Sequence, residues 1–139
     1  MKLDNKYIIG CHCMFYEIDM VEEYLNSLKL ALQDIENPEN VLIEMMWNMS
    51  EYFEKCETKQ SIYSKIEKLE KKYDIKSLFY EDNDNPYTMA DYRRELNNKC
   101  NGYDYVIWGE SDMLVPKELF QALEQIKDYA DSQNIHKFV

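Results

Sequence analysis

Glycine is scarce in this sequence of 139 residues, which has only three, at positions 10, 102 and 109. Loops that hold the phosphates of dinucleotides or nucleoside triphosphates need several glycines a few residues apart. The spacing of these three glycines fits neither kind of loop. The sequence therefore excludes a G-x-G-x-x-G dinucleotide turn and a Walker phosphate loop.

Long apolar runs and positive charge are also lacking. No stretch approaches the roughly 20 apolar residues that span a bilayer, and the N-terminal residues have no apolar signal core. Lys and Arg number 16 against 27 Asp and Glu, which gives a formal net charge of −11. Because such a surface repels phosphate backbones, we expect no sequence-independent nucleic-acid binding. We expect a cytoplasmic protein without a transmembrane segment.

The four cysteines are consistent with the expected cytoplasmic compartment. Cys11 and Cys13 share one face of a predicted strand, whereas Cys56 and Cys100 stand alone, so we expect buried thiols rather than disulfides. The Cys11-His12-Cys13 spacing does not suit a zinc knuckle, and no second Cys/His cluster follows.

Short apolar runs alternate with helical patterns along the chain. The runs predict strands over 7–13, 41–47, 77–80 and 105–108, with a fifth beginning at 136–139. Between the runs, apolar residues at helical spacing predict four helices. The alternation predicts one α/β domain over 1–139, a three-layer sandwich around a mostly parallel sheet.

Capping residues predict where the helices begin. Asp19 is expected to cap the first helix, with Glu22 completing a capping box, and Asn37-Pro38 to end it. A charged helix is expected over 58–73. Thr88 is expected to cap a helix through Asn98. Pro116 is expected as the first residue of the last helix, whose inward face comprises Leu119, Phe120, Leu123, Ile126 and Ala130.

Ligands of open parallel sheets bind beyond the carboxyl ends of the strands. The most informative loop there is 109–116, where Glu110 and Asp112 follow an apolar strand and precede Pro116. On an extended backbone, side chains at i and i+2 project to the same side. Two such carboxylates can share a Mg²⁺ or Mn²⁺ ion, although acidic triplets in an acidic chain are more often solvated turns. The flanking strand and proline favour the metal site.

Residues 103–112 have the sequence YDYVIWGESD, and they are followed by MLVP and a predicted helix with Leu119 and Phe120. This segment resembles the acidic-motif segment of family 2-like glycosyltransferases with the A-type nucleotide-sugar fold. Here Glu110 replaces the first Asp of the family's Asp-x-Asp motif. The resemblance implies a nucleotide-diphosphate sugar donor and a Mn²⁺ or Mg²⁺ ion. Asp112 would be the stronger metal ligand, and Glu110 would assist or contact ribose.

Other positions match that family more weakly. The resemblance implies nucleotide contacts from the loop between His12 and Tyr16, and places Asn48 where the family often has an acid that meets the base. An arginine facing the nucleotide would be Arg93 or Arg94. From composition alone, Asp84 in the polar loop 81–86 is a minor candidate for a nucleotide contact, and Tyr16 could stack on a base or sugar.

The leading hypothesis is a glycosyltransferase, or its donor-binding half, in which the metal ion would act as a Lewis acid on the diphosphate leaving group. The acceptor is unknown, and the acceptor-binding half of such enzymes has no counterpart in the 139 residues. The alternative is a non-catalytic α/β structural or interaction domain derived from such a fold. A metal-dependent nucleotidyltransferase is a weaker third possibility. We also expect self-association, or a partner that covers the edge of the sheet.

Overall fold

Four parallel strands form one sheet in the computed structural model, which describes residues 1–50 and 59–135. In spatial order they are β3 (Lys76–Tyr80), β2 (Val41–Asn48), β1 (Tyr7–Met14) and β4 (Tyr105–Glu110). Each neighbouring pair is parallel. The predicted α/β class is confirmed.

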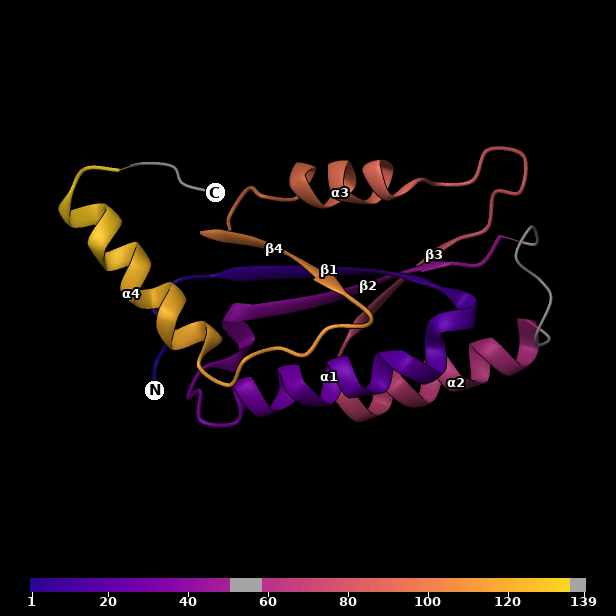
Figure 1. The fold of residues 1–139 in the computed structure, drawn as a ribbon, viewed down its shortest axis with the longest axis horizontal. Helices are drawn as coiled ribbons and strands as arrows, with labels where there is room; N and C mark the ends of the chain where they lie inside the picture. The colour runs from indigo at the N-terminus through magenta and orange to yellow at the C-terminus, as the bar shows by residue number, and fades with distance from the viewer. Residues whose placement is uncertain (51–58, 136–139) are drawn as a thin grey trace.

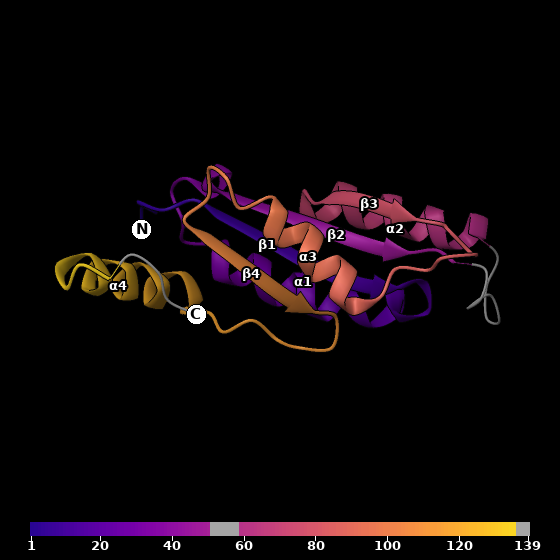
Figure 2. The ribbon, with the colours of Figure 1, turned by 90° about the horizontal axis from the view of Figure 1, so that it is seen from above.

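Helices lie on both faces of the sheet (Figure 1). α1 (Ile18–Leu32) and α2 (Lys59–Tyr73) cover one face, and α3 (Met89–Asn98) covers the other. α4 (Leu119–Ser132) lies near the N-terminus, at the end of the sheet where the strands begin (Figure 2). Two short 3₁₀ turns, Phe15–Glu17 and Pro38–Asn40, adjoin α1 and β2. The three-layer arrangement is as predicted.

The alternation of side chains along β1 divides the core in two. The larger core lies between the sheet and α1 and α2, and it includes Cys11 and Cys13. The smaller core lies under α3. Gly10 lets α3 come close, because a Cβ there would lie 2.6 Å from a methyl carbon of Leu96. The two cysteines of β1 are buried as expected, whereas Cys100 is exposed, which corrects the prediction for that thiol. Cys56 lies outside the described residues.

Helix starts differ from the sequence expectations in two places. The expected box of Asp19 and Glu22 does not form, because α1 begins at Ile18. Instead the carboxylate of Glu17 accepts a hydrogen bond from the Met14 backbone N–H at 2.8 Å. The first helix also ends earlier than predicted, at Leu32.

The later helices give one confirmation and one correction. Thr88 caps α3 as predicted, with Asp91 completing its capping box. α4 begins at Leu119 rather than at Pro116. Of its expected inward face, Phe120 and Ala130 are buried, but Ile126 is exposed.

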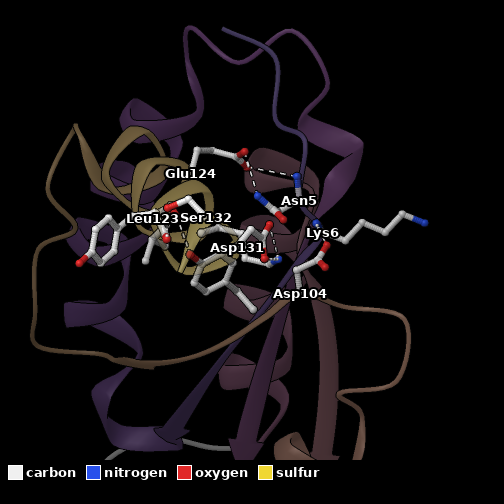
Figure 3. A network of polar contacts seen from close by, with 10 residues as sticks. Asn5, Lys6, Asp104, Leu123, Glu124, Asp131 and Ser132 are labelled. Atoms are coloured by element: carbon white, nitrogen blue, oxygen red, sulfur yellow. Dashed lines mark hydrogen bonds and ion pairs between the residues drawn. The ribbon is translucent and has the colours of Figure 1, made fainter. Parts of the chain in front are cut away.

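A buried carboxylate joins α4 to the N-terminal segment (Figure 3). Glu124 accepts hydrogen bonds from the backbone N–H groups of Asp4 and Asn5, from the Asn5 side chain, and from the Tyr7 hydroxyl at 2.6 Å. Asp104, just before β4, accepts one from the Lys6 backbone. These contacts hold the opposite end of the sheet from the candidate site.

The outer edges of β3 and β4 have no partner strand within residues 1–50 and 59–135. The fifth strand expected at 136–139 and the predicted helix start at Thr58 fall outside the described residues. In the described part of the chain, no helix is both long enough and apolar enough to cross a bilayer.

Candidate functional site

The order of the strands changes direction between β1 and β4. From β1 the chain moves outward through β2 to β3, and then crosses back to place β4 on the other side of β1. Crevices at such a switch point, at the carboxyl ends of the strands, are where open α/β sheets bind ligands. His12 of β1 and Glu110 of β4 are register partners there.

A small hollow lies at this point, between β1, β4 and α3, and is named here the α3 hollow. Its volume of about 20 Å³ suits one water-sized group rather than a whole ligand. Three of the predicted site residues line it, namely His12, Arg93 and Glu110. The other lining residues are Gly10, Met46, Met89, Tyr92, Leu96, Trp108 and Gly109.

The arginine that faces the hollow is Arg93. Its Nη2 lies 3.3 Å from Glu110 Oε1, and its guanidinium carbon lies 5.4 Å from the centre of the Trp108 ring. Arg94 instead pairs with Asp91 at 3.0 Å and lines a separate cleft that α3 forms with Tyr80 and the loop after β3. The structure thus separates two arginines that the sequence left equivalent.

Gly109 allows α1 to press against the end of β4. A Cβ at Gly109 would lie 2.1 Å from the Tyr24 hydroxyl oxygen. Tyr24 is buried, so its ring has little room to withdraw. The glycine of the Trp-Gly-Glu-Ser-Asp segment is therefore required by packing beneath the site.

The two candidate metal ligands do not share one extended backbone, which corrects the geometric premise. Glu110 is the last residue of β4, and a turn follows in which the Met113 N–H donates to the Glu110 carbonyl at 3.2 Å. Asp112 lies exposed in that turn. Burial raises the pKa of the Cys11 thiol, and the charges of Glu110, Glu17 and Asp112 raise it further.

Glu110 and Asp112 are the two oxygen donors that the sequence predicts for a metal ion. Among the residues that the structure describes, no three His, Cys, Asp or Glu side chains come together as a metal cluster. Glu110 and Asp112 would supply two carboxylates, and Mg²⁺ commonly takes one or two from the protein and completes its shell with water and phosphate oxygens. Two carboxylates are within the number that Mg²⁺ takes from a protein.

Asn48 ends β2 and is held by its own loop. Its side chain is buried, and its Oδ1 accepts a hydrogen bond from the Ser50 N–H at 3.0 Å. It lines a second hollow, of about 210 Å³, with Tyr80, Tyr87, Phe79, Glu81 and Asp82. It does not line the α3 hollow.

Tyr16 and Asp84 lie apart from these hollows. Tyr16 is 51% exposed and packs edge-to-face on Phe15. Asp84 is exposed in the loop that follows β3, where its backbone N–H donates to Asp82. Neither residue lines the α3 hollow, in which His12, Arg93 and Glu110 come together.

Tyr92 and Trp108 are site residues that were not predicted from the sequence. The His12 ring stacks on the Tyr92 ring at 3.8 Å between centroids, and burial lowers the pKa of His12 to about 4, so the imidazole is neutral at pH 7. Helical spacing could have predicted that Tyr92 faces the sheet, because it precedes the buried Leu96 by one turn. Strand alternation could have predicted Trp108, because it lies two residues before Glu110 and therefore on the same face of β4.

Comparison of the sequence with protein-family models and with curated proteins gives no match. The case for a function therefore depends on the geometry of the switch point.

Proposed function

We propose that this chain binds a nucleoside-diphosphate sugar at the carboxyl ends of β1 and β4, as the donor site of a metal-dependent glycosyltransferase. The observation that carries the proposal is the meeting of His12, Arg93 and Glu110 at the switch point of a parallel sheet. The turn with Asp112 adjoins them. The resemblance of residues 103–112 to the acidic-motif segment of family 2-like glycosyltransferases supports the same ligand class.

Arg93 would bind the diphosphate. A guanidinium offers paired N–H donors that match phosphate oxygens, and charge-assisted hydrogen bonds of this kind are among the strong ones. Its present partner, Glu110, holds it at the edge of the α3 hollow in an ion pair in which both side chains are nearly half exposed. Exposed pairs are weak, so a phosphate group can compete for the guanidinium.

A cation is needed beside this arginine because the chain is strongly acidic. Glu110 and Asp112 would repel a diphosphate if they were alone. A divalent ion held by Asp112 and Glu110 would neutralise them and supply positive charge to the leaving nucleoside diphosphate. The two carboxylates would position that ion at the end of β4.

Calorimetric titration with UDP- and GDP-sugars, with and without Mn²⁺, tests the proposal. We expect saturable binding that requires the metal and that Asp112→Asn weakens at least tenfold. Asp128→Asn is the matched control, because it removes the same charge from an exposed position of α4. Failure of every donor to bind in the presence of Mn²⁺ would refute the proposal.

A non-catalytic interaction domain is the second candidate. It is favoured by one observation: Glu110 and Asn48, two of the ligand contacts predicted from the sequence, already have partners in Arg93 and Ser50. This candidate predicts that Asp112→Asn changes neither the stability of the chain nor its binding of a protein partner. It also predicts no turnover with any donor.

A further inference from the structure

Two buried polar atoms at the α3 hollow have no hydrogen-bond partner within the described parts of the chain. They are the Nε2 atom of His12 and the hydroxyl oxygen of Tyr92. The Tyr92 side chain is 1% exposed. Buried polar atoms in folded proteins are nearly always hydrogen-bonded, to protein, water or ligand. A pair of unpartnered atoms on two stacked rings therefore indicates a group that binds between β1 and α3.

The space beside these atoms has the right size for one such group. Both residues line the α3 hollow, whose volume of about 20 Å³ exceeds the minimum for a single water-sized group. Its other lining includes Arg93, Trp108 and Glu110, which are the residues of the proposed donor site. A molecule bound at that site would thus lie next to the hollow and can place one group in it.

The hydrogen-bonding chemistry selects the kind of group. A neutral imidazole nitrogen either accepts or donates, depending on the tautomer, and a phenol hydroxyl does both. A hydroxyl can bond to both atoms in either tautomer, because it donates one hydrogen bond and accepts two. A phosphate oxygen only accepts, and the carboxylate of Glu110 would repel it. An ammonium group only donates.

We propose that the α3 hollow receives one sugar hydroxyl of the bound donor, and that His12 and Tyr92 hydrogen-bond it. The inference rests on the proposed function. It makes His12 and Tyr92 residues that select for a hydroxylated ligand. Stacking of the two rings at 3.8 Å fixes the direction of the imidazole before the ligand arrives.

Imidazole ¹⁵N NMR during titration with UDP-glucose, GDP-mannose and the corresponding nucleoside diphosphates tests the inference in the wild-type chain. Mg²⁺ replaces Mn²⁺ because Mn²⁺ would broaden the signals. The chain has two histidines, so the signals that His12→Phe removes identify His12. We expect the His12 Nε2 resonance to shift on saturation with a donor.

Binding measurements on variants provide a second test. His12→Phe keeps a ring to stack on Tyr92, and Tyr92→Phe removes the hydroxyl alone. We expect each to weaken binding of the responding donor about tenfold. Tyr80→Phe is the control, because the Tyr80 hydroxyl bonds to Glu95 instead and Tyr80 does not line the α3 hollow.

The outcomes separate this inference from the proposed function. If a donor binds but the His12 resonance stays unchanged and both variants bind as tightly as the wild type, the hollow holds only water and the inference is wrong. If no donor binds at all, the proposed function itself fails, and the inference fails with it.

Discussion

Arg93 reaches from α3 to the end of β4, where its Nη2 lies 3.3 Å from Oε1 of Glu110. Its neighbour Arg94 pairs with Asp91 and lines a different cleft, together with Tyr80 and Tyr87. The turn of about 100° between successive helical residues is enough to assign two adjacent arginines to different surfaces. Only Arg93 of the two lies close enough to the switch point to contact a ligand there.

The two arginines therefore differ in what their removal does. We expect Arg93→Ala to weaken binding of a nucleoside-diphosphate sugar by about ten- to a hundredfold, the usual effect of losing a charge-assisted hydrogen bond. Arg94→Ala removes the same charge from the outer surface and should change the dissociation constant less than twofold. Calorimetry on both variants measures this, and equal losses would show that Arg93 has no specific role.

Gly109 should tolerate no side chain. We expect Gly109→Ala to lower the free energy of unfolding by about 1–3 kcal/mol, because the new Cβ would collide with the buried Tyr24 hydroxyl. Addition of Tyr24→Phe should recover part of the loss, since the hydroxyl oxygen is the nearest atom. Urea denaturation measures both variants.

Gly102 provides the control for that substitution. It has a φ of +88°, and no atom lies within 4 Å of the position that a Cβ would take there. Gly102→Ala should therefore cost only about 1 kcal/mol of backbone strain. A loss at Gly109 no larger than this, or no recovery with Tyr24→Phe, would contradict the packing explanation.

The partly buried imidazole of His12 should make stability depend on pH. Burial lowers its pKa from 6.5 to about 4 in the folded chain. Between these values the unfolded state binds more protons, so the free energy of unfolding falls as the pH falls from 6.5 to 4. The full shift corresponds to roughly 3 kcal/mol. We expect about 2 kcal/mol, because the ring is partly exposed.

His12→Phe isolates this contribution from the carboxyl groups that titrate in the same range. Urea denaturation of both chains at about pH 7.5, 5.5 and 4.5 should show the wild type losing more stability than the variant. Parallel pH profiles would mean that His12 titrates alike in the folded and unfolded states.

Glu124 should matter more to folding than its position on a surface helix suggests. Glu124→Ala leaves the Tyr7 hydroxyl and the donors of Asp4 and Asn5 without an acceptor. We expect a loss of about 2–4 kcal/mol in the free energy of unfolding. Gln125→Ala, at the next and exposed position, should change it by less than about 0.5 kcal/mol, as expected for surface substitutions. Similar effects of the two variants would contradict the network in Figure 3.

The sequence was sufficient to predict most of the fold, because its signals are local. Apolar runs located the four described strands, and Thr88 marked the start of α3 to the residue. The start of α4 was wrong because proline at a first helical position is a preference, and the chain forms a turn from Pro116 to Leu119 instead. Glu124 was missed although it lies one turn after the buried Phe120 on the same face.

The site was harder to predict because it joins residues that are distant in the sequence. Strand ends indicated His12 and Glu110, yet the direction of the Arg93 side chain depends on how α3 packs over Gly10, which no local pattern records. The extended backbone predicted for Asp112 is wrong because β4 ends at Glu110 and a turn follows. Asn48 was predicted only from its position at the end of a strand. Its hydrogen bond with the Ser50 N–H depends on the conformation of the loop, which the sequence does not show.

Paramagnetic broadening by Mn²⁺ tests the central claim most directly. In ¹H–¹⁵N spectra of the wild-type chain with saturating UDP- or GDP-sugar, trace Mn²⁺ should bleach amide signals around Glu110 and Asp112 and at the end of β1, while those of α4 persist. Asp112→Asn should restore the bleached signals. Uniform broadening along the chain, or bleaching that Asp112→Asn leaves unchanged, would contradict a donor site at the β1–β4 switch point.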